Sequence, residues 1–296
     1  MKILFVGGGN MCQAIIGGLI AQGQLTADIH VIEPLADTRS VLTAMEIASA
    51  SEFHERDLVT DVIVLAVKPQ MMKRAVTPLA GKLRSQLVIS IAAGIRVTDL
   101  ACWLGGKKAD SAPDAYKNIV RAMPNTPALI RAGITGLYAA SAVAAESRRA
   151  AEKLLGAVGQ TAWFDQESML DAVTAVSGSG PAYVFYFIEA LEQAACELGF
   201  DDACARQFAL QTFLGSAKLA AASDDAPNLL RERVTSKRGT TERAIETFDA
   251  LELKRHFVAG VKAACERSRE LGDELSREAT NDATVAGTIA TNTGKN

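Results

Sequence analysis

The sequence predicts a doubly wound α/β domain followed by a domain made only of helices. Apolar strand-like segments alternate with helical segments as far as Phe164, and no strand pattern follows Asp165. A length of 296 residues is enough for two domains, each with its own core. We expect the first domain at residues 1–164, the second at 165–272 and a mobile, Thr/Ala/Asn-rich tail at 273–296.

Composition excludes several classes of function. A net charge of −3 gives no long basic surface for nucleic acid. No stretch of about 20 uninterrupted apolar residues occurs, so we expect no membrane-spanning helix. The N-terminus has a strand pattern rather than that of a signal peptide, and the five cysteines include no CxxC pair. The cysteines therefore predict reduced thiols in a cytoplasmic protein without a metal site. The three histidines lack metal spacing, so we also expect no His-based nucleophilic triad.

A glycine turn joins the first predicted strand to the first predicted helix. The apolar run Ile3 to Val6 is typical of a parallel strand buried on both faces, and a one-faced helix follows from Asn10 to Gln22. Gly7 and Gly9 match the first two positions of the dinucleotide fingerprint, whereas Cys12 occupies the third. Such a turn lets backbone N–H groups approach a pyrophosphate. The alternative is a glycine turn in some other α/β protein.

The second predicted strand ends on a carboxylate. It runs from Asp28 to Ile32, and Glu33 follows. In a dinucleotide fold this carboxylate would meet the ribose hydroxyls of the adenosine and favour NAD. Arg39 could instead hold a 2′-phosphate, and a solvated strand end is the plain alternative for Glu33. The residues alone leave this choice open.

Two further strands end on residues suited to a cofactor crevice. Asp61 to Val67 leads into Lys68 and Pro69, and the proline keeps Lys68 extended. Gln86 to Ile91 opens onto the small residues Ala92 to Gly94, which allow a flat ring or a phosphate to approach closely. Such strand ends line the crevice in which a dinucleotide lies. The alternatives are a strand-end charge for Lys68 and ordinary tight packing for the small residues.

The rest of the α/β domain follows the same pattern. Trp103 to Tyr116 is polar and contains glycine, which predicts a surface excursion. A strand from Asn118 to Met123 then ends in a rigid loop, Pro124 to Pro127, that bears amide and hydroxyl groups. The last predicted elements are strands at 134–140 and 161–164 around a helix at 144–157.

The second domain is predicted as helices with apolar, Ala-rich faces. Small residues from Ser177 to Gly180 and then Pro181 begin a helix that Gly199 ends, and further helices are expected at about 202–222 and 251–271. These faces suit a core or a dimer interface. Between the last two helices, small hydroxyl residues precede a helix with Glu242 in its first turn. Free N–H groups at that helix start could hold a carboxylate, or Thr240 or Thr241 could simply cap the helix.

Taken together, these motifs resemble those of the pyrroline-5-carboxylate reductase family. The resemblance extends to about residue 271, and the motifs occur in the family's order. The segments that carry it are Gly7 to Met11, Ala66 to Pro69, Ser90 to Gly94, Arg121 to Pro127, Asp171 to Tyr183 and Val234 to Thr241. The last two are specific to that family, while the first is shared by many dehydrogenases.

The resemblance implies a Rossmann-like N-terminal domain and an all-α domain that interlocks into a homodimer, with further assembly, often into decamers. It also implies hydride transfer from NADPH, or from NADH, to the C=N carbon of 1-pyrroline-5-carboxylate. The product would be L-proline, made in the last step of proline biosynthesis. No metal or nucleophile is needed, because a hydroxyl donor and close positioning over the nicotinamide can be enough.

Residue by residue, the family's motifs assign two groups of side chains. The pyrophosphate would lie against Gly7, Gly8, Gly9, Asn10, Met11 and Cys12, and the nicotinamide half along Ala66, Val67, Lys68, Pro69, Ala92, Ala93, Gly94, Met123, Pro124, Asn125 and Thr126. The substrate would contact Ser236, Gly239, Thr240 and Thr241, with Thr241 as the catalytic donor to the ring nitrogen. Glu167 matches a position that contacts substrate in relatives.

The chain departs from the family where Lys237 and Arg238 replace the usual Pro-Gly, so we expect the loop to lose its pre-set turn. Cys12 in place of a small residue is a milder change. Two alternatives stay open. A dehydrogenase of the β-hydroxyacid or imine-reducing kind would usually carry a lysine on the helix that links the domains, and Tyr183 to Gly199 contains none. A catalytically silent nucleotide-binding relative would have Lys237 and Arg238 as its damaged feature.

Overall fold

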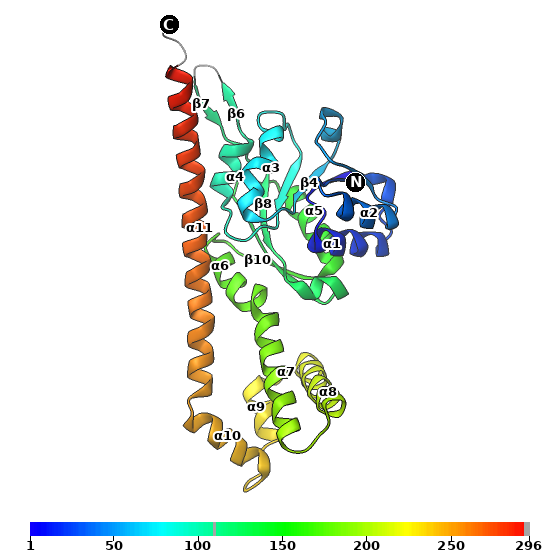
Figure 1. Cartoon of the computed structure of the whole chain (residues 1–296), viewed down its shortest axis with the longest axis vertical. Helices are drawn as coiled ribbons and strands as arrows, with labels where there is room; N and C mark the ends of the chain where they lie inside the picture. Colours follow the sequence, from blue (N-terminus) through cyan, green and yellow to red (C-terminus); the bar gives the residue numbers. More distant parts are fainter. Residues whose placement is uncertain (109–110, 293–296) are drawn as a thin grey trace. The chain divides into compact units, whose positions relative to one another are not determined.

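The structure is a computed structural model that describes residues 1–108 and 111–292 (Figure 1). It forms two compact units. The first comprises Met1–Gly178 with Ala264–Asn296, and the second comprises Ser179–Ala263.

The first unit is built on an eight-stranded sheet of order β10-β9-β8-β5-β4-β1-β2-β3. Neighbouring strands are parallel except β8 and β9, which are antiparallel. The chain goes from β1 outward to β3 and then returns to β4 on the other side of β1. The strands are β1 Ile3–Val6, β2 Ile29–Ile32, β3 Ala48–Ala50, β4 Val62–Leu65, β5 Leu87–Ser90, β8 Ile119–Met123, β9 Gly133–Ala139 and β10 Gly159–Trp163. This topology confirms the predicted doubly wound fold.

Helices cover both faces of this sheet, so its central strands are apolar at successive residues. On β1, Ile3 and Phe5 belong to one buried cluster, while Leu4 and Val6 belong to the other. The first cluster includes residues of α1 (Asn10–Ala21), α2 (Ala36–Ala44) and α5 (Ala145–Leu155). The second includes residues of α3 (Met72–Val76) and α4 (Val97–Leu104). Short 3₁₀ turns lie at Thr26–Asp28, Glu55–Leu58, Pro69–Met71, Thr77–Leu79, Thr126–Ile130 and Gly156–Val158.

The predicted surface excursion from Trp103 to Tyr116 contains regular structure that the sequence pattern missed. α4 continues to Leu104, and β6 (Gly106–Lys108) pairs with β7 (Ser111–Asp114) in a separate antiparallel sheet. Neither short strand shows the apolar alternation by which a strand is recognised. Residues 109 and 110, which the prediction also covered, lie outside the described residues.

The division between the units falls after Gly178, not at the predicted boundary after Phe164. A short helix, α6 (Met169–Val173), packs on β9, and a π-helical turn follows at Thr174–Gly178. A Cβ at Gly136 of β9 would lie 2.8 Å from the side chain of Val173 and 3.2 Å from that of Leu170. This close packing ties α6 to the sheet, so it belongs to the first unit.

The second unit is helical, as predicted. It contains α7 (Gly180–Glu197), α8 (Asp202–Ala221), α9 (Pro227–Arg233), α10 (Thr240–Ala250) and the first part of α11 (Leu253–Asn292). Asp201 caps α8 by accepting a hydrogen bond from the Cys204 N–H at 2.8 Å. Among the described residues that follow Trp163, none forms a strand.

α11 is much longer than expected. The sequence pattern predicts an end near Leu271, but the helix passes through Gly272 and continues to Asn292. The predicted tail at 273–296 is therefore helical as far as it is described, and 293–296 lie outside the described residues. Within the described residues, no helix combines the length and the apolar character needed to cross a bilayer.

Candidate functional site

The register of the central strands gathers the predicted cofactor residues at one edge of the sheet. Val6 pairs with Ile32 and with Leu65, so the residues that follow each of them, Gly7, Glu33 and Ala66, lie side by side. Leu65 in turn pairs with Ser90, which brings the segment that contains Ala92, Ala93 and Gly94 to the same edge. This edge includes the switch point between β1 and β4, where open α/β sheets bind their ligands.

Space and conformation, together, require glycine at the turn after β1. Gly7 has φ 100°, and a Cβ there would lie 2.7 Å from the carbonyl oxygen of Ala66. Gly9 is the N-cap of α1 and has open space beside it, since a Cβ at this residue would meet no atom within 4 Å. No side chain caps α1, and its first turn contains no acidic residue. This combination of a bare helix start and open space fits a pyrophosphate.

Cys12, at the third position of the fingerprint, points into the core. Its side chain is fully buried and belongs to the same cluster as Ile15 and Ile16. Burial and, second, the negative charge of Glu33 raise the pKa of the Cys12 thiol well above its usual range. The side chain is therefore a neutral, apolar packing group. Only the backbone at this position is available to a phosphate, whereas the neighbouring Asn10 is exposed and Met11 is half-buried.

Glu33 is not the solvated strand end that the sequence left open. It is buried, and its carboxylate accepts hydrogen bonds from the Gly8 N–H at 2.8 Å and from the Leu35 N–H at 2.9 Å. The guanidinium of Arg39 donates to the carbonyl oxygens of Glu33 and Pro34, at 2.8 and 2.6 Å. Glu33 thus links the glycine turn to the end of β2 by hydrogen bonds, and Arg39 stabilises the backbone that follows in the same way.

The segments that follow β4 and β5 have the backbone conformation and close packing that the sequence predicts. Lys68 is exposed and extended, with φ −60° and ψ 145°, as the following Pro69 requires. The side chain of Val67 packs against Gly7, 2.9 Å from the position of a Cβ there. Ala92 is buried, and Gly94 has φ 76°, a conformation that favours glycine.

The loop after β8 is held by packing and by its own side chain. The Met123 methyl group lies 2.6 Å from the position that a Cβ would take at Gly178, so the two residues are in tight contact. The side-chain oxygen of Asn125 accepts a hydrogen bond from the Ile134 N–H at 2.9 Å, and Pro124 is buried. Of the predicted loop residues, Met123 is half-buried and Thr126 is exposed.

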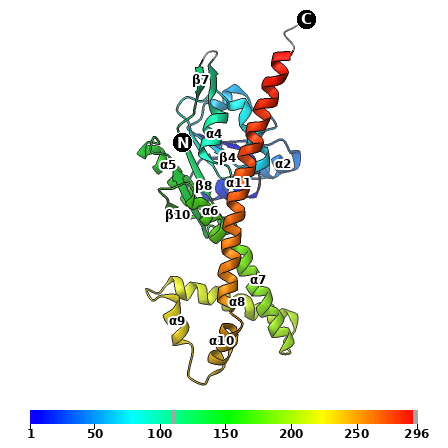
Figure 2. The same ribbon diagram turned by 90° about the vertical axis from the view of Figure 1, so that its left-hand side faces the viewer.

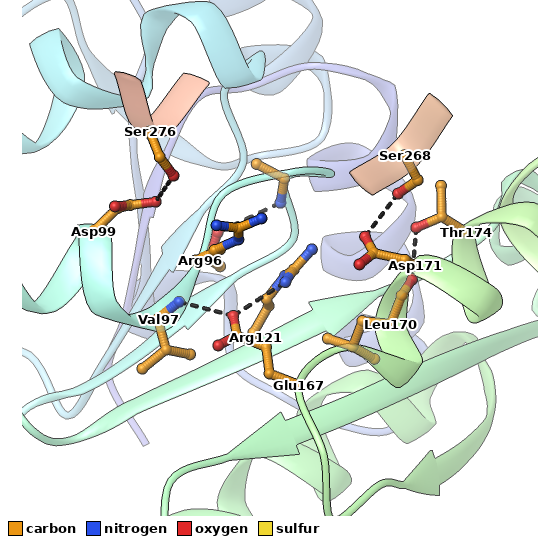
Figure 3. A network of polar contacts seen from close by, with 12 residues as sticks. Arg96, Val97, Asp99, Arg121, Glu167, Leu170, Asp171, Thr174, Ser268 and Ser276 are labelled. Atoms are coloured by element: carbon orange, nitrogen blue, oxygen red, sulfur yellow. Dashed lines mark hydrogen bonds and ion pairs between the residues drawn. The ribbon is translucent and has the colours of Figure 1, made fainter. Parts of the chain in front are cut away.

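Glu167 has partners that the sequence did not reveal (Figure 3). Its Oε1 atom accepts hydrogen bonds from the Val97 N–H at 2.8 Å and from the Arg121 guanidinium at 3.0 Å. Arg121 is 4% exposed, so this ion pair neutralises a buried charge. Glu167 therefore caps the first turn of α4 within the first unit. A buried arginine predicts an acidic partner, but its position in the chain cannot be read from the sequence.

In the second unit, residues Ser236 to Gly239 form the turn that the family motif predicts to bind substrate, and we call it the substrate turn. The Gly239 N–H donates to the Ser236 carbonyl oxygen at 3.0 Å, and a Cβ at Gly239 would lie 2.4 Å from the Ser236 hydroxyl oxygen. Arg238 takes φ 59°, the region that glycine would favour, and its N–H donates to the Glu242 carboxylate at 2.5 Å. The turn therefore forms with Lys237 and Arg238 in place of the family's Pro-Gly, but without the conformational preference that glycine would supply at position 238. A left-handed arginine costs about 1–2 kcal/mol, and the contact with Glu242 helps to offset it.

Thr240 and Thr241 are the first two residues of α10. The N-cap is Gly239, and no side-chain hydrogen bond caps the helix, so neither threonine is its cap. Thr241 is half-buried, whereas Thr240 and Ser236 are exposed. The N–H groups of this first turn are therefore suited to a small carboxylate. Within the described residues, no group of three or more His, Cys, Asp or Glu side chains is placed to hold a metal ion.

Comparison with known proteins gives two family matches and several close relatives. Residues 2–94 match the family described as NADP oxidoreductase, coenzyme F420-dependent, and residues 167–271 match pyrroline-5-carboxylate reductase dimerisation. The pyrroline-5-carboxylate reductase of Pseudomonas aeruginosa is 43% identical over 280 residues, which cover 93% of this chain and 98% of the relative. The structure of a pyrroline-5-carboxylate reductase from Coxiella burnetii has a TM-score of 0.82 and 38% identity, with 91% and 98% of the two chains covered. A Plasmodium falciparum pyrroline carboxylate reductase with NADP bound has a TM-score of 0.78 and 27% identity, with 92% and 98% covered.

Proposed function

Because the chain belongs to the pyrroline-5-carboxylate reductase family, we propose that it reduces 1-pyrroline-5-carboxylate to L-proline with NADPH or NADH. This is the last step of proline biosynthesis. The observation that carries the proposal is the substrate turn. The hydrogen bond from the Gly239 N–H to the Ser236 carbonyl oxygen forms although Lys237 and Arg238 replace the family's usual residues. Thr241 lies just after this turn, at an uncapped helix start.

The first unit would bind the cofactor along the sheet edge. The bare start of α1 and the open space at Gly9 suit the pyrophosphate, and the buried Glu33 carboxylate lies on the β2 side, where the ribose of the adenosine is expected. The ends of β4 and β5 would line the nicotinamide half, with Met123 to Thr126 beside them. When bound, the reduced nicotinamide supplies the hydride.

The chain's own residues would bind and polarise the imine. Backbone N–H groups at the start of α10 would hold the substrate carboxylate, and the cations of Lys237 and Arg238 would attract it. The Thr241 hydroxyl would donate a hydrogen bond to the ring nitrogen and so prevent negative charge from developing there. Holding the carboxylate and the nitrogen together fixes which ring carbon faces the hydride.

We propose that the protein assembles through its helical unit into a homodimer, with decamers as the larger assembly. α7 is described over its whole length, and none of its residues is buried, although most are apolar. The Tyr183 hydroxyl is buried yet has no hydrogen-bond partner among the described residues. Large apolar side chains of this unit are exposed, namely Val184, Phe185, Tyr186, Phe208, Leu214, Leu219 and Phe248. A face of this kind suits a second copy of the chain. A cytoplasmic location stays a prediction.

Two measurements test these proposals. Purified protein is mixed with NADPH or NADH and 1-pyrroline-5-carboxylate, and both cofactor oxidation and L-proline formation are followed. Proline made in step with cofactor oxidation is the expected result. Tight cofactor binding without turnover would indicate the silent relative. Oxidation of β-hydroxy acids with NADP⁺ or NAD⁺, without reduction of the imine, would indicate the other dehydrogenase class. Sedimentation equilibrium tests assembly, since a monomer at micromolar concentration would contradict the dimer.

A further inference from the structure

The end of α11 that belongs to the first unit packs against the loop between β5 and α4. We call residues Ser268 to Ser276 the arm segment and residues Ile91 to Arg96 the β5–α4 loop. Figure 2 shows this part of α11 running alongside α4, and Figure 3 shows the polar contacts between them. Both segments belong to the same compact unit.

Three polar pairs join the arm segment to the sheet domain. The Ser268 hydroxyl donates to the Asp171 carboxylate at 2.8 Å, and the Ser276 hydroxyl donates to the Asp99 carboxylate at 2.7 Å. Between them, the Arg96 guanidinium forms an ion pair with Asp273. Asp99 lies in the first turn of α4, and Arg96 is its N-cap residue, so two of the three pairs hold the point where the loop enters α4.

Close backbone packing accompanies these pairs. Gly272 is buried, and a Cβ there would lie 3.2 Å from the carbonyl oxygen of Gly94. A Cβ at Gly94 would lie 3.2 Å from the Leu275 side chain and 3.6 Å from the Gly272 nitrogen. Leu275 itself packs against the buried cluster that contains Ile95 and Leu100. The backbones of the loop and the helix therefore pack closely at Gly94 and Gly272, and the Leu275 side chain packs beside them.

The opposite face of the arm segment does not take part in this contact. On that face, Glu270 and Glu274 pair with Arg267, the residue just before the segment, each at 2.8 Å, and all three side chains are about half exposed. The face that contacts the loop and the sheet domain carries Ser268, Gly272 and Leu275, at helical spacing. The same stretch of helix thus offers a face that contacts the loop and a face that does not, which provides a matched control.

The contacted loop is part of the proposed cofactor track. It follows β5, whose Ser90 pairs with Leu65 of β4, at the side of the switch point expected to receive the nicotinamide half. On its other side, the start of α4 is held by Glu167, which accepts the Val97 N–H. Gly94 has φ 76°, so the loop depends on its surroundings to keep one conformation.

We propose that the arm segment positions the β5–α4 loop for the nicotinamide half of the dinucleotide, with Asp273 acting through Arg96. This rests on the proposed function, because it takes the loop as a cofactor contact. Asp273 and Ser276 are positioning residues and touch no reacting atom. The Arg96–Asp273 pair is nearly half exposed, so its loss should weaken dinucleotide binding by only about fivefold.

The test compares Asp273→Ala with Glu274→Ala, its neighbour on the exposed face. NADPH and NADH dissociation constants are measured by fluorescence titration, and kcat and KM are measured with the imine. Asp273→Ala should raise the dissociation constant and the cofactor KM about fivefold, while kcat at saturating cofactor and the imine KM stay unchanged. Glu274→Ala should leave all four values at those of the wild type. Arg96→Ala should add nothing further in the Asp273→Ala background.

Hydrogen exchange tests whether Asp273→Ala weakens cofactor binding by making the β5–α4 loop less ordered. Amides of residues 91–97 should exchange faster in Asp273→Ala but not in Glu274→Ala, and Asp273→Glu should restore part of the affinity. If Asp273→Ala fails to fold, Ser276→Ala is measured in its place. An unchanged dissociation constant, or equal effects of the Asp273→Ala and Glu274→Ala changes, would overturn the proposal. Wild-type protein that binds NADPH but does not reduce the imine would instead overturn the proposed function and leave this binding comparison valid.

Discussion

Glu33 combines a structural role with a predicted role in cofactor selection. Its carboxylate ties the Gly8 N–H to the end of β2, and it carries a negative charge on the side of the sheet where the adenosine ribose is expected. Arg39, the cation that could have bound a 2′-phosphate, is occupied with two carbonyl oxygens. We therefore predict that selection between NADPH and NADH depends on this carboxylate.

We predict that Glu33→Gln raises the affinity for NADPH relative to NADH by about tenfold, because it removes a negative charge near the 2′-phosphate. Glutamine keeps an oxygen that can accept the Gly8 N–H. Dissociation constants for both cofactors, from fluorescence titration, measure the ratio. Asp37→Asn neutralises an exposed carboxylate in the first turn of α2 and serves as the control. An unchanged ratio in Glu33→Gln would show that the carboxylate is only structural.

Thr241 carries the proposed catalytic hydroxyl. Thr241→Ala should slow hydride transfer by about 10²-fold and leave cofactor affinity intact, since one donor to the developing charge is removed. The control is Thr247→Ala on the same helix, whose exposed hydroxyl donates only to the Arg243 carbonyl oxygen. Single-turnover rates of imine reduction are measured for both variants, and only Thr241→Ala should be slow. Equal rates for Thr241→Ala and wild type would contradict the assignment.

Arg238 adopts a strained backbone conformation in the substrate turn. Replacing it with glycine should raise the free energy of unfolding by about 1 kcal/mol, because φ 59° suits glycine. Arg243→Gly, in the interior of α10, should lower it by about 1 kcal/mol. Urea unfolding measures both changes. Destabilisation by both substitutions would mean that Arg238 contributes contacts that outweigh its strained backbone.

Some of these residue roles could be predicted from sequence and others could not. Glycine spacing and a strand-end acid are local patterns, so Gly7, Gly9 and Glu33 were identified as candidates. Glu167 is different, because its partners Val97 and Arg121 lie 70 and 46 residues away along the chain. Only the fold brings them together. At Arg238, residue propensity disfavours the left-handed conformation, and the carboxylate of Glu242, four residues further on, supports it.

At the level of elements, α1 shows how packing overrides helix propensity. Gly17 and Gly18 are adjacent in this helix, but a Cβ at Gly18 would lie 2.5 Å from the Ala157 carbonyl oxygen, whereas one at Gly17 would meet nothing within 4 Å. Gly18 is therefore a contact point with the turn before β10, and Gly17 is an exposed helix residue.

We predict opposite effects of the same substitution at these neighbours. Gly17→Ala should stabilise the protein by up to about 1 kcal/mol through helix propensity. Gly18→Ala should destabilise it by about 1–3 kcal/mol, since a backbone carbonyl must move. Thermal or urea unfolding gives both values. Stabilisation by Gly18→Ala would show that α1 can shift away from this turn at little cost.

The length of α11 could not be predicted from the same kind of local evidence. Gly272 signals a helix end, and the residues after it lack clear periodicity. In the fold, this glycine is where the helix meets the Gly94 backbone, so its lack of a side chain serves packing rather than termination. Helix-end signals fail where a glycine is required by a neighbouring element.

At the level of the whole molecule, strand–helix alternation was sufficient to predict the doubly wound sheet and the helical second unit. It did not predict that β9 runs antiparallel to β8, or that α11 returns to the first unit. Both depend on contacts between distant segments. The same holds for function. The predicted cofactor residues lie in one unit and most of the predicted substrate residues in the other, so motif order across nearly the whole chain was the most informative signal.

Isotope transfer shows whether the protein passes a hydride from the reduced nicotinamide to the imine carbon. Purified protein is incubated with 1-pyrroline-5-carboxylate and NADPH or NADH carrying deuterium at the transferable position, and the proline is analysed by mass spectrometry. We predict L-proline with one deuterium at the former C=N carbon, formed more slowly by Thr241→Ala. Unlabelled proline, or oxidised cofactor without proline, would exclude this hydride transfer.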